Sequence, residues 1–346
     1  MPYAYTEAMH HLRVLSVFAL TALSMTACAA PGDADTSGDE ASAVGEATPK
    51  LGTSAVALPD GRLASSLGVL GNRMFVALNN DYGHFLSVDP VRMRVAEEWG
   101  PRATLHLRGA DGIQADGEQL VLLGYDNNLD GDPVDILFGR PPANQGAQFA
   151  FVLSWFDPSA KKITKKIRIE LDRTILEGRS AFVDRPNAAF VVQDGVVHFA
   201  LCHPRASKLV KIPVPAARET TLNQDGSLFE GGTELSPIVK GLAIDGGSAY
   251  VAVPKGSNDG YLERVDLATG RKTKVGGGLG HPIRVRIADG KAFVADHNGR
   301  LVVVDKESGR TLREEDVGSW VDDLTVSGNY VYVATREHFF VTKVRP

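Results

Sequence analysis

Short hydrophobic runs alternate with turn residues along most of the chain. From residue 56 onward, apolar segments of four to seven residues, rich in Val, Phe and Tyr, are separated by Asp-Gly or Gly-Asn pairs. Runs bounded in this way predict β-strands joined as hairpins. The clearest copies of one recurring strand span residues 72–78, 247–253, 290–295 and 328–334, and weaker copies span 119–124 and 195–202. The body of the chain is therefore predicted to be all-β.

Each copy belongs to a larger unit of four strands. A short apolar strand precedes it, a third strand that ends in aspartate follows it, and a fourth, more polar strand completes the unit. Four antiparallel strands with a polar outermost member are typical of a propeller blade. The aspartates that end the third strands are Asp89, Asp157, Asp266 and Asp305. Because they recur at equivalent positions, we interpret them as turn caps rather than as catalytic residues.

The spacing of the units predicts the number of blades. The centres of the second strands lie 46, 78, 51, 43 and 39 residues apart, at Val76, Leu122, Ala200, Val251, Val294 and Val333. A period of roughly 40 to 50 residues is typical of propellers. We therefore predict one propeller of six four-stranded blades over residues 56–346, or seven if the long gap hides a degenerate blade. The last unit lacks an outer strand, so residues 54–65 are expected to supply it and close the ring.

This body resembles the bacterial YVTN and quinoprotein-like propellers. The resemblance spans about 290 residues and rests on the strand pattern. It implies a fold and does not by itself imply an activity.

The N-terminal residues have the features of an export signal. Arg13 precedes an apolar run at residues 14–23, which is too short to span a bilayer. The following Leu-Ser-Met-Thr-Ala-Cys-Ala sequence resembles the lipobox of bacterial lipoproteins, in which the cysteine is lipidated. The resemblance implies a signal peptide at residues 1–27, and lipidated Cys28 followed by a flexible acidic tether at 28–55. An ordinary cleaved signal that ends near Ala27 or Ala30 is the alternative.

The lipobox resemblance also implies a location at the cell envelope. The residue after the cysteine is Ala29 rather than aspartate. In a Gram-negative host the resemblance therefore implies sorting to the outer membrane, and in another host it implies the outer face of the cytoplasmic membrane.

An acidic stretch inserted between two strands is a candidate calcium site. Oxygen ligands at alternating positions allow a loop to wrap around a hard cation. The stretch resembles the FG-GAP calcium loop of integrin-type propellers if one extra residue is allowed. The candidate ligands are Asp126, Asn128, Asp130, Asp132 and Asp135. The alternative is an acidic surface loop that uses Asn and Asp for its turns alone.

A few polar residues are candidates for a site at one end of the central channel. If the loops between strands meet there, His203, His281, His297 and Asp322 approach one another. The simpler interpretation is that these histidines are solvated or belong to the core. Cys202 lies within an apolar strand and is expected to be a buried, inert thiol.

Composition limits the function further. A net charge of −5 argues against nucleic-acid binding, and two cysteines exclude a disulfide scaffold or a Cys-rich metal site. The chain has no nucleophile-elbow, phosphate-loop or haem-attachment motif. We expect a non-enzymatic, membrane-anchored binding or scaffold module for a protein, glycan or small molecule. The alternative is a calcium-dependent, lactonase-like hydrolase with its site in the central channel.

Overall fold

The computed structural model describes most of the residues after the predicted tether. The described ranges are 55–58, 63–78, 85–99, 112–127, 149–171, 187–202, 207–223, 227–256, 258–318, 320–335 and 340–345. The chain divides into two compact units, Met1–Ala47 and Thr48–Pro346, and every described residue belongs to the second. The predicted signal peptide and Cys28 lie outside the described residues. No helix in these ranges is long and apolar enough to cross a membrane.

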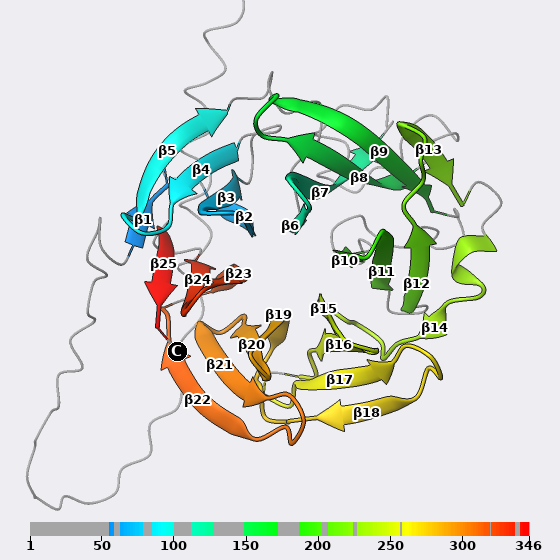
Figure 1. The fold of residues 1–346 in the computed structure, drawn as a ribbon. Helices are drawn as coiled ribbons and strands as arrows, with labels where there is room; N and C mark the ends of the chain where they lie inside the picture. The colour runs from blue at the N-terminus through cyan, green and yellow to red at the C-terminus, as the bar shows by residue number, and fades with distance from the viewer. Residues whose placement is uncertain are drawn as a thin grey trace, which may run out of the picture. The chain divides into compact units, whose positions relative to one another are not determined.

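Six sheets form a ring (Figure 1). Each sheet is one blade, and the blades are counted here along the chain from their innermost strands. Blade one contains β2 (Ala64–Leu70), β3 (Arg73–Leu78), β4 (Phe85–Asp89) and β5 (Arg94–Trp99). Blade two contains β6 (Gly112–Asp116), β7 (Gln119–Asn127), β8 (Phe149–Asp157) and β9 (Lys162–Glu170). Blade three contains β10 (Asn187–Gln193), β11 (Val196–Cys202), β12 (Lys208–Pro213) and β14 (Thr233–Glu234).

The second half of the ring repeats the same order of strands. Blade four contains β15 (Gly241–Asp245), β16 (Ser248–Val253), β17 (Tyr261–Asp266) and β18 (Lys272–Val275). Blade five contains β19 (Pro282–Ala288), β20 (Lys291–Asp296), β21 (Arg300–Asp305) and β22 (Thr311–Asp316). Blade six contains β23 (Val321–Ser327), β24 (Tyr330–Thr335), β25 (Phe340–Val344) and β1 (Ala55–Ala57). The prediction of an all-β propeller with six blades is confirmed.

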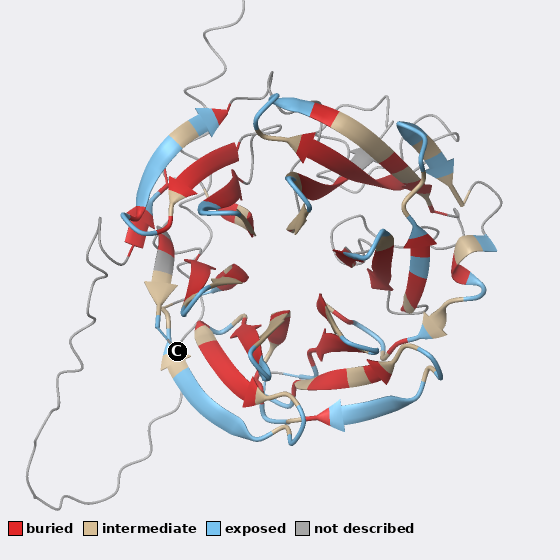
Figure 2. Ribbon diagram, in the orientation of Figure 1, coloured by how far each residue is buried: buried red, intermediate tan, exposed pale blue. Residues whose placement is uncertain are grey.

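The hydrophobic core consists of six clusters, and each cluster lies between two neighbouring blades. One cluster joins Phe75 of blade one to Phe156 of blade two, and another joins Val251 of blade four to Leu209 of blade three. The second strands, such as β3, β11, β16, β20 and β24, are largely buried, whereas the outermost strands β5, β18 and β22 are mostly exposed (Figure 2). Since a blade buries its faces only against its neighbours, the blades depend on closure of the ring for a complete core.

The N-terminal strand closes the ring as predicted. β1 pairs antiparallel with β25, with Val56 opposite Val341. The side chain of Val56 is buried in the cluster between blades six and one. On the other side of the same junction, the Tyr332 hydroxyl and the Lys343 ammonium both donate to the carbonyl of Pro90 in blade one. The pairing stretch is shorter than the predicted 54–65, because Ala64 already belongs to β2.

The first hairpin of every blade turns within two residues. These turns are residues 71–72, 117–118, 194–195, 246–247, 289–290 and 328–329. Asp194 and Gly195 both have positive φ, as do Asp289 and Gly290, which matches a type I′ turn. The other four turns have a positive-φ glycine at the first position. Four of the six turns are Asp-Gly or Gly-Asn pairs and the other two are Gly-Glu and Gly-Gly, so a glycine at positive φ fixes each hairpin locally.

Four aspartates cap the turns between third and fourth strands. Asp89 Oδ1, for example, accepts the backbone N–H groups of Val91 and Arg92 at 2.9 and 3.0 Å. Asp157, Asp266 and Asp305 accept equivalent hydrogen bonds from residues two or three positions later. Hydrogen bonds lower the pKa of each carboxyl below its usual value. The largest contribution comes from the hydroxyls of Ser159 and Ser308 at Asp157 and Asp305, and from backbone N–H groups at Asp89 and Asp266. We refer to these four residues as the turn aspartates.

Two short strands depart from the regular blade pattern. β13 (Glu219–Leu222) leaves blade three and pairs parallel with β9, which gives blade two a fifth strand. The outer strand of blade three, β14, is only two residues long and follows a single-turn helix, η2 (Ser227–Phe229). Both strands lie between Ala200 and Val251, whereas the longer gap between Leu122 and Ala200 contains β8, β9 and β10. The described residues of that longer gap form no seventh blade.

Candidate functional site

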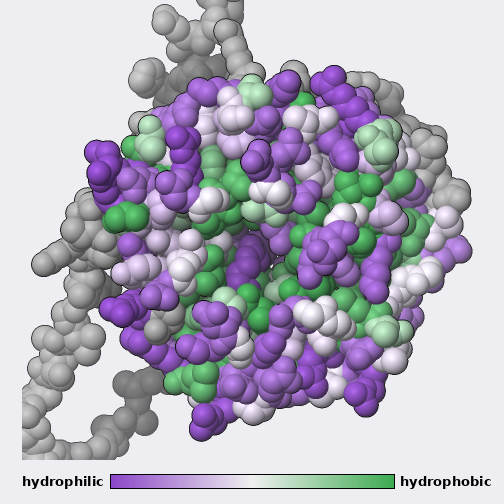
Figure 3. All heavy atoms as spheres, in the orientation of Figure 1, coloured by the Kyte–Doolittle hydropathy of each residue, from purple (hydrophilic) through white to green (hydrophobic). Residues whose placement is uncertain are grey.

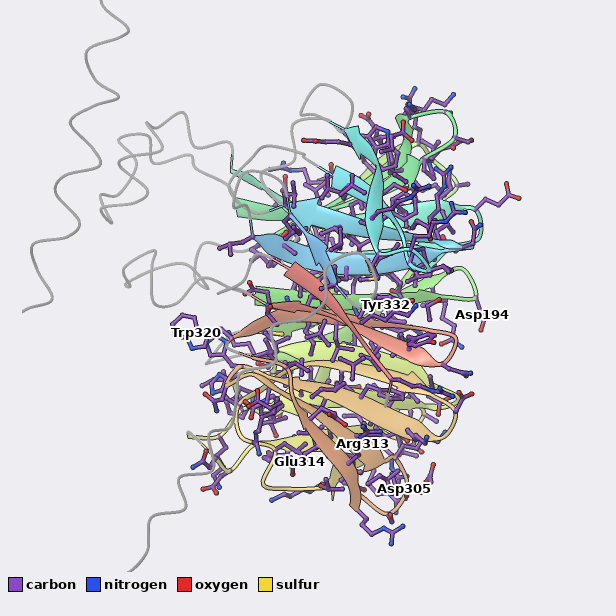
Figure 4. The ribbon with its side chains drawn as sticks, turned by 90° about the vertical axis from the view of Figure 1, so that its left-hand side faces the viewer. Asp194, Asp305, Arg313, Glu314, Trp320 and Tyr332 are labelled. Carbon is purple, nitrogen blue, oxygen red and sulfur yellow. The ribbon has the colours of Figure 1, made fainter. Side chains whose placement is uncertain are left out.

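The two flat faces of the propeller have different connections. The face that carries the two-residue turns and the turn aspartates is called the turn face here. The opposite face carries the connections from second to third strands and from blade to blade, and is called the loop face. One loop-face connection separates Asn127 of β7 from Phe149 of β8. In the edge-on view of Figure 4, Asp194 and Asp305 lie at one side of the disc and Trp320 at the other.

Two histidines and a tryptophan meet on the loop face. The rings of His281 and His297 have centroids 5.7 Å apart, and Trp320 stacks on His297 at 5.0 Å with an interplanar angle of 29°. His281 precedes β19, His297 follows β20 and Trp320 precedes β23, so blades five and six together build the group. The Trp320 side chain is 49% exposed. We call these three residues the aromatic group.

A buried carboxylate holds the aromatic group in place. Asp296 is fully buried, and its Oδ1 accepts the backbone N–H of His281 at 2.9 Å. Its Oδ2 accepts Nε and an Nη of Arg300 at 2.9 and 2.7 Å. The backbone of His297 donates to the carbonyl of His281 at 2.9 Å. A Cβ at Gly280, where φ is +67°, would lie 2.2 Å from Asp296 Oδ2, so glycine is required beside the carboxylate.

A second polar group lies inside the central channel. The channel contains a cavity of about 140 Å³ that is lined by residues of blades two to six. Its charged lining residues are Lys240, Arg284, Arg286 and Asp323. Lys240 directly precedes β15, and Arg284 and Asp323 are the third residues of β19 and β23. Because inner strands begin at the loop face, these three residues lie toward that face, and Arg286 lies two residues further along β19.

Asp323 connects three blades from this position. Its side chain is 1% exposed. Oδ2 accepts Ser66 Oγ and the backbone N–H of Leu67 in blade one, both at 2.8 Å. Oδ1 accepts the N–H of Leu324 at 2.8 Å and lies 3.3 Å from Nε of Arg284 in blade five. The carboxylate therefore joins the inner strands of blades five, six and one by charge-assisted hydrogen bonds.

The predicted channel residues are brought together only in part. His281 and His297 are neighbours, whereas His203 lies outside the described residues. Asp322 is half-buried, and within the part of the chain that the structure describes Asp323 rather than Asp322 lines the cavity. No group of three or more His, Cys, Asp or Glu side chains that could hold a metal occurs in the described ranges.

The candidate calcium ligands fall almost entirely outside the described residues. Asp126 lies at the end of β7, where only its backbone is described, and its partner in β8 is Ala150. Asn128, Asp130, Asp132 and Asp135 lie outside the described ranges. The strand ends that flank these residues, Asn127 and Phe149, lie at the loop face.

Cys202 lies at the end of β11 and is a free, buried thiol. Burial raises the pKa of this thiol to about 12, and nearby Lys240 and Arg284 counteract only part of the effect. Its high pKa disfavours the thiolate, so Cys202 is unsuited to act as a nucleophile.

Sequence reasoning missed Asp296, Arg284, Arg286, Lys240 and Asp323. An available signal was that Asp296 ends a hydrophobic strand four residues before Arg300. For Asp323 no local signal existed, because its partners Ser66 and Leu67 lie 257 and 256 residues away along the chain.

A comparison with known protein families supports the repeat architecture. The LVIVD repeat family matches residues 280–306 and 319–341, which fall on blades five and six. A search of curated proteins finds no match to the sequence. The computationally designed protein Ika8 is similar at 12% identity and a TM-score of 0.48, over 85% of this chain and all of its own. The Pan2 WD40 domain of Neurospora crassa is similar at 10% identity and a TM-score of 0.49, over 84% of this chain and 93% of its own.

The matched segments coincide with structural units of the ring. The match at 280–306 contains β19, β20 and β21. The third of these strands includes the sequence Leu-Val-Val-Val-Asp, which differs at one residue from the motif that names the repeat. This chain is therefore a six-bladed β-propeller whose last two blades are similar to the LVIVD repeat.

Proposed function

We propose that this protein is an exported, lipid-anchored binding module that contacts its ligand, a protein, glycan or small molecule, through the loop face. The single observation that carries the proposal is Trp320, a half-exposed tryptophan that is held in one orientation by stacking on His297. Tryptophan is enriched among the residues that dominate binding energy at interfaces. A pre-positioned side chain also loses little conformational entropy when it binds.

The rest of the propeller is suited to present this surface. The turn face has short hairpins that are fixed by glycines and turn aspartates, whereas the loop face has the longer connections. Rigid scaffolds that carry variable loops are a common arrangement for recognition. The buried Asp296 fixes the backbone under the aromatic group and so supports a preformed site.

The test compares two surface variants of the full chain. Trp320→Ala removes the proposed contact, and Val91→Ala removes a 77% exposed hydrophobic side chain from a turn-face turn as a matched control. The probe is an array of glycans and envelope extracts from the producing cell. We expect a ligand that the wild type and Val91→Ala bind equally and that Trp320→Ala binds about ten-fold or more weakly. Equal binding by all three proteins would refute a loop-face site.

The lipid anchor at Cys28 has its own test. The mass of the mature protein extracted from membranes is expected to include acyl chains on an N-terminal Cys28, and Cys28→Ser is expected to release the protein from the membrane. A mature N-terminus at Ala29 or later, without modification, would contradict the anchor. The binding role does not depend on this outcome.

A structural calcium ion in the loop that contains Asp126, Asn128, Asp130, Asp132 and Asp135 is the remaining part of the proposal. We expect calcium to raise the melting temperature of the wild type and not that of Asp130→Ala. No shift in the wild type would refute the site. Nothing in the described ranges favours the calcium-dependent hydrolase, so no reaction is proposed.

A further inference from the structure

We propose that the central channel binds a small anion that carries carboxylate or phosphate groups, through Lys240, Arg284 and Arg286. The site is separate from the aromatic group, since the two share no residue. It adds a ligand class to the proposed binding module, and each site can be tested without the other.

The charges of the described residues that line the cavity do not balance. Three cationic side chains, Lys240, Arg284 and Arg286, face one carboxylate, Asp323, which gives an excess of two positive charges among these described residues. Arg284 Nε and an Nη of Arg286 lie 3.3 and 3.8 Å from Asp323 Oδ1. The other oxygen, Oδ2, is already occupied by Ser66 and Leu67. Asp323 therefore has no free oxygen for a third cation.

Lys240 is the member of this charged group that has no ion pair among the described residues. Its backbone is fixed, because its N–H donates to Ala252 and its carbonyl accepts an Nη of Arg284. Among the described residues, no carboxylate pairs with its half-buried ammonium. Burial and the nearby charge of Arg284 lower the pKa of Lys240. A partly buried ammonium without a counter-charge is unfavourable, and a bound anion removes that cost.

The backbone that carries Lys240 is strained two residues earlier. Ile238 has a φ of +61°, which is rare for a β-branched residue, and its side chain is 46% exposed. Such strain persists where the surrounding structure imposes it and is concentrated at ligand sites. At Gly241, a Cβ would lie 2.8 Å from the Cα of Arg284, so the missing side chain allows β15 and β19 to approach. This close approach places Lys240 beside Arg284.

The cavity has the dimensions and polarity for a small ligand. Its volume of about 140 Å³ is enough for several non-hydrogen atoms, and Gln114 adds a polar side chain to the lining. Gln114 Oε1 accepts the N–H of Val192 at 2.9 Å. In the space-filling view of the turn face, the centre is hollowed and hydrophilic side chains lie within the hollow (Figure 3). Guanidinium groups bind carboxylate and phosphate oxygens with well-defined geometry.

The experiment measures binding of citrate and of inorganic phosphate to the full chain by calorimetry at constant ionic strength, with glucose as a neutral probe. The variant is Lys240→Gln, and the conservative variant Lys240→Arg retains the charge. The matched control is Lys272→Gln, which removes an exposed lysine from the outer strand of the same blade. We expect binding of at least one anion, weakened about ten-fold by Lys240→Gln and changed less than about two-fold by Lys240→Arg or Lys272→Gln.

The free proteins give an independent readout. Because Lys240→Gln removes an unpaired charge, we expect its melting temperature without anion to equal or exceed that of the wild type. The proposal is refuted if neither anion binds, if glucose binds equally well, or if Lys272→Gln weakens binding as much as Lys240→Gln. Trp320→Ala is expected to leave anion binding unchanged, so the channel and the loop face can fail separately.

Discussion

The buried carboxylate of Asp323 provides the sharpest test of how the ring is held together. The change is Asp323→Asn, which retains the shape of the side chain and removes its charge. The carboxylate accepts three hydrogen bonds at 2.8 Å and faces Arg284 Nε at 3.3 Å, with donors at both oxygens. An asparagine has only one acceptor oxygen, so its amino group meets donors in either orientation.

The size of the effect follows from these contacts. Two hydrogen bonds to a charged acceptor are lost, at about 1.5 to 3 kcal/mol each, and two guanidinium groups lose their counter-charge. Breaking a buried ion pair from one side typically costs about 3 to 5 kcal/mol. We expect Asp323→Asn to lower the free energy of unfolding by about 4 kcal/mol.

The assay is equilibrium unfolding in urea, followed by the fluorescence of the three tryptophans. The matched control is Asp305→Asn, an exposed turn aspartate, for which a much smaller loss is expected. The double variant Arg284→Gln/Asp323→Asn is expected to be less destabilised than the sum of the two single changes. A loss below about 1 kcal/mol, or strictly additive single changes, would refute the role of this carboxylate as a brace between blades.

Three further predictions concern other parts of the ring. Val56→Asp places a carboxylate in the core between blades six and one, so we expect about 3 kcal/mol of destabilisation in urea, whereas Ala57→Asp at the exposed next position leaves stability nearly unchanged. Burial raises the pKa of the Cys202 thiol to about 12. In a Cys28→Ser background, we therefore expect Cys202 to resist a disulfide reagent at about pH 8 and to react once the protein is unfolded. Reaction of the folded protein would contradict this expectation. The turn aspartates have pKa values in the folded protein below the value of 3.8 in the unfolded chain. The stability that they contribute is therefore present above about pH 4 and is lost as the pH falls further. Between about pH 5 and pH 3, we expect the urea midpoint to fall less in a variant with all four changed to Asn than in the wild type.

The sequence alone determined the features that depend on local physics. Two-residue turns with glycine at positive φ, and apolar runs between them, specify each hairpin without reference to the rest of the chain. Repetition of the hairpins then determined the number of blades, and the missing outer strand of the last unit indicated that an N-terminal segment closes the ring. The turn aspartates were recognisable for the same reason, since they cap turns within three residues of themselves.

The tertiary structure decided what depends on contacts between distant residues. Asp323 meets Ser66 only because the ring closes, and Lys240, Arg284 and Arg286 share a cavity only because neighbouring inner strands surround one channel. β13 and β14 were not predicted, because strands of four and two residues are too short to show a periodic pattern, and their pairing comes from the neighbouring strands. A strand pattern specifies which residues are buried, whereas the charges that meet at a site depend on how the blades are packed.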